Sequence, residues 1–77
     1  MAIYNVHAES IDRIVTQTLK DVSGNFGSME IVLAMAEVMG RVIVDVSANP
    51  VQGREAVDAA MGHLGKVLDL GFKAKGY

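Results

Sequence analysis

The sequence predicts an all-α fold: a small three-helix, bundle-like domain with antiparallel neighbours that associates with copies of itself. Apolar residues recur at helical spacing in three segments, and short turns rich in glycine, asparagine and proline separate these segments. Short connections favour antiparallel neighbours. Hydrophobic residues make up 51% of the 77 residues, and the mean hydropathy is +0.29. A single small domain cannot cover that much apolar surface, so we predict one helical domain over residues 1–77 that forms a homo-oligomer, most simply a dimer.

The first helix is expected over residues 7–22, where Ala8, Ile11, Leu19 and Val22 lie at helical spacing. Glu9 and Asp12 lie in its early turns, where the helix dipole favours negative charge. This pattern is typical of an amphipathic helix with one solvated side.

A turn is expected at residues 23–27, because two glycines and an asparagine permit positive φ. We expect Phe26 to fold from this turn onto the core, and we also keep it as a candidate partner contact. Ser28 is expected to be the N-cap of the next helix, with Glu30 in its first turn.

The central helix is expected over residues 28–47 and is the longest apolar segment of the chain. Its four charged residues fall on a stripe roughly 80° wide at about 100° per residue, and the rest of its circumference is apolar. A helix that is apolar nearly all round is predicted to be buried. The residues that we expect to mediate self-association are Met35, Met39, Val42 and Ile43. The β-branched run 42–44 leaves a short strand as the competing prediction.

The third helix is expected over residues 50–70. Asn49 is suited to the N-cap position and Pro50 to the first helical position, while Gln52 can reach back to complete a capping box. Gly71 is expected to end the helix in a left-handed conformation. Residues 72–77 are then predicted to form a mobile basic tail.

Three glycines lie inside this third helix, at Gly53, Gly62 and Gly65. Each costs about 1 kcal/mol relative to alanine, which suggests that another chain segment packs close to them; a simply weak helix is the alternative. We therefore predict a partner-binding face on the outer side of this helix. Its candidate residues are Arg54, Asp58, Gly62, His63 and Lys66.

Composition and motifs argue against several function classes. The chain has no cysteine and a net charge of −2, which does not favour nucleic-acid binding. His7 and His63 lack the spacing of metal sites, and no nucleophile–base pair can be identified, so we predict no enzyme, no metal and no cofactor. No apolar run reaches the length of about 20 residues needed to cross a membrane, and residues 1–6 do not resemble a signal peptide. A cytoplasmic protein is expected.

The segment Gly27-Ser28-Met29-Glu30 resembles the Asp-Ser-Leu segment of acyl carrier proteins, in which the serine carries phosphopantetheine. The similarity covers four residues; Gly27 stands in place of the aspartate, and the chain is nearly neutral where that family is strongly acidic. We therefore do not assign the family. Ser28 remains a candidate anion or ligand site at a helix N-terminus.

The sequence as a whole predicts a small non-catalytic helical protein that binds a larger protein partner. Its role would be accessory, regulatory or inhibitory, and its size is one that bacteria and their phages use for this purpose. The alternative is a small-molecule-binding, sequestering or carrier protein that uses a groove between subunits or the Ser28 helix end.

Overall fold

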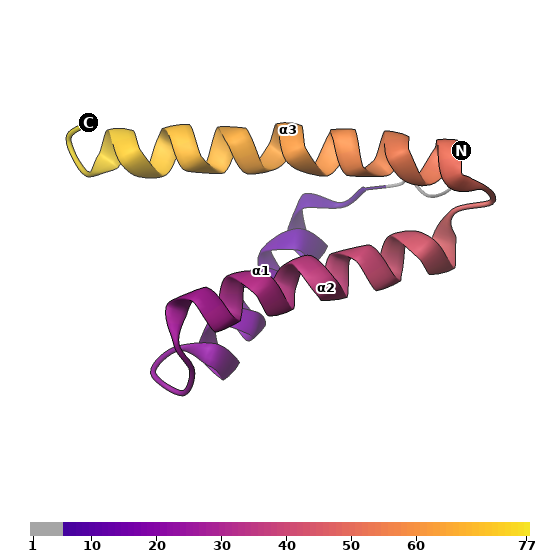
Figure 1. The fold of residues 1–77 in the computed structure, drawn as a ribbon. Coiled ribbons are helices and arrows are strands. Elements are labelled where there is room, and N and C mark those ends of the chain that lie inside the picture. The colour runs from indigo at the N-terminus through magenta and orange to yellow at the C-terminus, as the bar shows by residue number, and fades with distance from the viewer. Residues whose placement is uncertain (1–5) are drawn as a thin grey trace. The chain divides into compact units, whose positions relative to one another are not determined.

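The computed structural model describes residues 6–77, and in that range it contains three α-helices and no strand (Figure 1). The helices are α1 (Ala8–Val22), α2 (Ser28–Val46) and α3 (Pro50–Ala74). The all-α prediction is confirmed, and the β-branched run 42–44 is helical. Residues 1–5, which include most of the segment considered for a signal peptide, lie outside the described residues. Contacts divide the chain into two units, residues 1–40 and 41–77, and each is described by itself.

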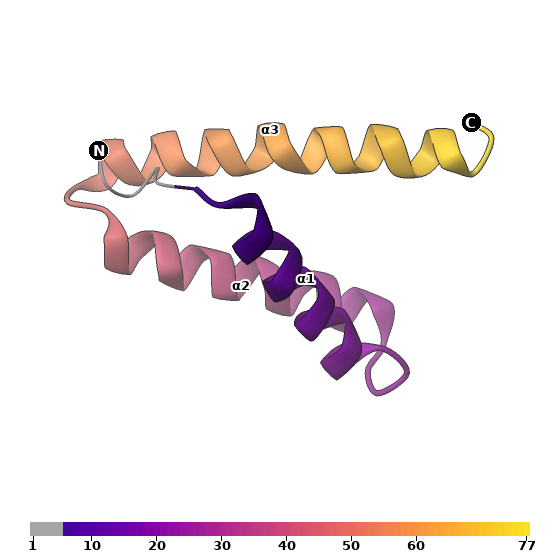
Figure 2. The same cartoon turned by 180° about the vertical axis from the view of Figure 1, so that it is seen from behind.

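The first unit contains α1, the turn after it and the first two-thirds of α2 (Figure 2). α1 begins after His7, whose carbonyl accepts from the backbone N–H of Ser10 at 3.0 Å. It ends where the N–H of Ser23 donates to the carbonyl of Leu19 at 2.9 Å. The chain then turns through Gly24, which has a φ of +77° that glycine adopts without steric cost.

α2 is capped one residue earlier than the sequence predicted. The carbonyl of Gly27 accepts from the N–H of Ile31, which makes Gly27 the N-cap and places Ser28 at the first helical position. The N–H of Gly27 donates to Oε1 of Glu30 at 2.9 Å. The carboxylate of Glu30 thus provides the reciprocal half of a capping box, and the expected N-cap role of Ser28 is corrected.

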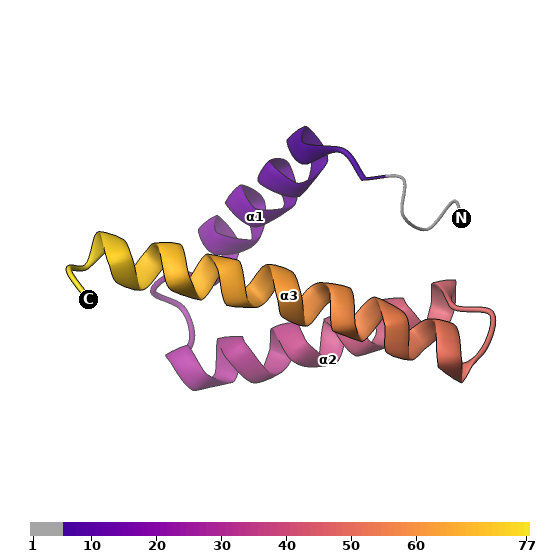
Figure 3. The same cartoon turned by 90° about the horizontal axis from the view of Figure 1, so that it is seen from above.

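The second unit contains the end of α2, a short turn and all of α3 (Figure 3). Oδ1 of Asn49 accepts from the N–H of Gln52 at 2.9 Å, which confirms Asn49 as the N-cap. Oε1 of Gln52 accepts in return from the N–H of Ala48 at 2.6 Å, one residue before the position that a standard capping box uses. Pro50 occupies the first turn, where its missing N–H leaves no helical bond unmade.

α3 ends later than expected. Gly71 lies inside the helix, and the glycine with positive φ is Gly76, at +95°. The N–H of Gly76 donates to the carbonyl of Lys73, and the N–H of Tyr77 donates to that of Phe72, both at 3.0 Å. The rings of Phe72 and Tyr77 meet edge to face at 5.9 Å between centroids. These bonds and this contact form a complete Schellman motif, so the expected mobile tail over 72–77 is corrected to a helix and its cap.

None of the described residues is buried, which corrects the prediction of a buried central helix. Partly buried side chains are few in each unit. In the first they are Thr18, Val22 and Ile31, and in the second they are mainly Ile43, Ser47 and the first three turns of α3. The apolar circumference of α2 was identified correctly, but the contacts within each unit do not cover it.

Candidate interaction surfaces

The predicted partner-binding residues on α3 lie on the surface. Arg54, Asp58, Gly62 and Lys66 follow one another at intervals of four residues, and all four are exposed. We call these four residues the polar ridge, because residues four apart are neighbours on a helix surface. His63 is also exposed but lies about 100° around the helix from Gly62. The structure therefore brings four of the five predicted residues together on one ridge.

The three glycines of α3 differ in what lies next to them. A Cβ atom at Gly53 would lie 3.6 Å from Oγ of Ser47 and 3.7 Å from Cγ2 of Ile43. At Gly62 and Gly65 a Cβ atom would meet nothing within 4 Å among the described residues. Gly53 therefore marks a close approach between α2 and α3, whereas Gly62 leaves an open notch in the polar ridge.

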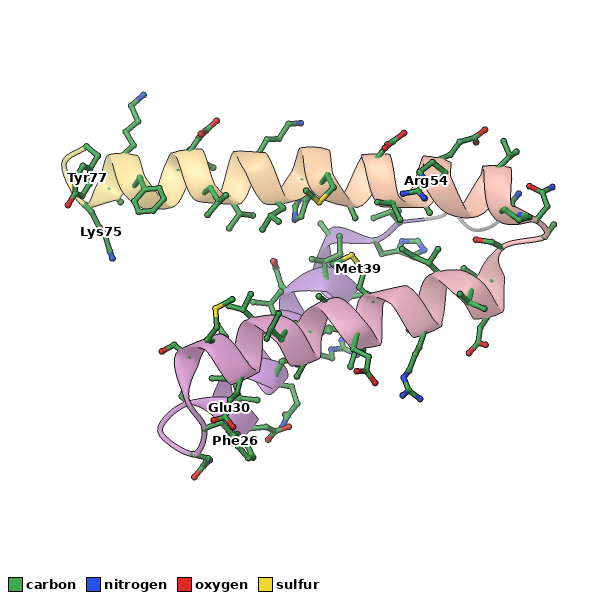
Figure 4. The ribbon with its side chains drawn as sticks, viewed as in Figure 1. Phe26, Glu30, Met39, Arg54, Lys75 and Tyr77 are labelled. Atoms are coloured by element: carbon green, nitrogen blue, oxygen red, sulfur yellow. The ribbon has the colours of Figure 1, made fainter. Side chains whose placement is uncertain are left out.

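A second surface of α3 is apolar. Met61, Leu64, Val67, Leu68 and Phe72 lie within an arc of about 140° at about 100° per residue, and we call them the α3 apolar face. Each of these side chains is between 45% and 58% exposed. Figure 4 shows most charged side chains of α3 along one edge of the helix and mostly carbon side chains along the opposite edge.

The sequence analysis did not single out this face. It placed Phe72 in a mobile tail, although the spacing from Leu64 to Leu68 to Phe72 continues the helical pattern past the expected end at Leu70. In α3 the partly buried residues are Gln52, Gly53, Ala56, Val57 and Ala60, and beyond Ala60 only Gly65 is less than exposed.

Three of the four residues predicted for self-association on α2 are more covered than the α3 apolar face, and Val42 is as exposed as that face. Met35 and Met39 are 36% and 39% exposed, and Val42 is 53% exposed. Ile43 is partly buried and lies against Gly53 within the chain. Part of this predicted surface is therefore already used by contacts inside the second unit.

Phe26 does not form the plug that the sequence suggested, because 63% of its side chain is exposed. It borders a shallow hollow of about 160 Å³ in the first unit, together with Val22, Ile31, Ala34 and Met35. Phe26 thus remains available for contact with another molecule.

A larger hollow of about 360 Å³ lies where α2 turns into α3. Its lining residues are Ile43, Val44, Ser47, Asn49, Pro50 and Gly53. Oγ of Ser47 is shielded from solvent and has no hydrogen-bond partner among the described residues. A hydroxyl of this kind is costly to leave unpaired, and a bound polar group could satisfy it.

No protein family, curated protein or solved structure matches this chain. Across residues 6–77, no three His, Cys, Asp or Glu side chains lie close enough together to hold a metal ion. None of the three described helices has both the length and the apolarity needed to span a membrane. At the N-terminus of α2, an anion near Ser28 would meet the carboxylate of Glu30, which already accepts from the N–H of Gly27. The surfaces of α3 therefore carry the functional argument.

Proposed function

We propose that this chain is a small non-catalytic helical protein that self-associates and acts by binding a larger protein partner. Its role would be accessory or regulatory, and the expected compartment is the cytoplasm. We further propose that the three helices pack as antiparallel neighbours of a single domain in the assembled protein.

The observation that supports assembly is the apolar content of the chain. Hydrophobic residues make up 51% of the 77 residues and the mean hydropathy is +0.29, which is more apolar side chain than one small domain can cover. Much of the exposed surface consists of large apolar side chains, for which water is an unfavourable environment.

The polar ridge supports the second half of the proposal, the larger partner. It combines a cation at Arg54, an anion at Asp58 and a second cation at Lys66, and such alternation gives specificity to a docked surface. The open notch at Gly62 lets a partner side chain or backbone approach the helix closely.

Gly62→Leu tests this proposal. A side chain at this position would meet nothing within 4 Å at its Cβ atom, and leucine is more favourable than glycine inside a helix by about 1 kcal/mol. The fold should therefore persist. The side chain fills the notch and should abolish capture of a stoichiometric partner from host extract by the tagged chain. Gly40→Leu is the matched control, since Gly40 lies inside α2 with equally open space, and it should capture the partner normally. Normal capture by Gly62→Leu would show that the ridge is only solvated surface.

The hollow at the α2–α3 turn favours the alternative function, binding of a small molecule. Its volume of about 360 Å³ falls within the range of about 300–1,000 Å³ seen for ligand sites, and it contains the unpaired Ser47 hydroxyl. Native mass spectrometry of the protein from its host distinguishes the two functions. A co-purifying small molecule that is lost in Ser47→Val would favour the alternative over the protein partner.

A further inference from the structure

We draw no further inference here: the strongest candidate, the hollow at the α2–α3 turn with the shielded hydroxyl of Ser47, already belongs to the alternative function proposed above, and nothing among the described residues shows what fills it.

Discussion

Asn49→Ala removes the side chain that caps α3. In the structure Oδ1 of Asn49 accepts from the N–H of Gln52 at 2.9 Å, and this N–H has no partner inside the helix. The return bond from Ala48 to Gln52 does not involve the lost side chain. The change should therefore lower the free energy of unfolding by about 1 kcal/mol, which lowers the melting temperature of a chain of this size by about 4–8 °C.

Thermal unfolding followed by circular dichroism at one fixed protein concentration measures this shift. Gln17→Ala is the control, because Nε2 of Gln17 donates to Oδ1 of Asp21 at 3.0 Å on the exposed side of α1. That bond joins two surface side chains and leaves no helix donor unpaired, so its loss should cost at most about 0.5 kcal/mol. Asn49→Ser should restore most of the stability. A melting temperature of Asn49→Ala that equals the wild-type value would show that α3 does not begin at this cap.

Three further substitutions test local features of the second unit. Gly53→Ala should raise the free energy of unfolding by about 0.5–1 kcal/mol, because alanine has the higher helix propensity and its methyl group meets Ser47 and Ile43 at ordinary contact distances. A lower midpoint of chemical denaturation would contradict that packing. Gly76→Ala should cost about 1 kcal/mol through its φ of +95°, whereas Gly71→Ala should gain about 1 kcal/mol inside α3. If chemical denaturation gives the opposite signs for this pair, the helix ends at Leu70 after all.

The helices were predictable because each is specified by neighbouring residues. The Asn49-Pro50 start of α3 follows from capping chemistry, and the helical spacing in α2 outweighed the β-branched run 42–44. The residue at which α3 ends was harder to predict from the sequence, because two glycines followed by an aromatic residue could end the helix, Gly71-Phe72 and Gly76-Tyr77. Which pair forms the Schellman motif depends on the contact between Phe72 and Tyr77, and local spacing does not determine that contact.

The degree of burial was the weakest part of the sequence-based account. An apolar helix face predicts that something covers it, but it does not predict which segment or which chain does so. The sequence therefore placed α2 in a core and the self-association residues at Met35 and Met39. In the structure Met35 and Met39 are 36% and 39% exposed, and no residue of α2 is buried.

The mass of the unmodified protein in solution tests the central claim most directly. Sedimentation equilibrium across the micromolar range measures it without a label or a partner. The account predicts a mass of at least twice 8.2 kDa, because the exposed apolar surface of one chain is covered by another. A single species at 8.2 kDa throughout that range would contradict the claim that this protein functions as an assembly.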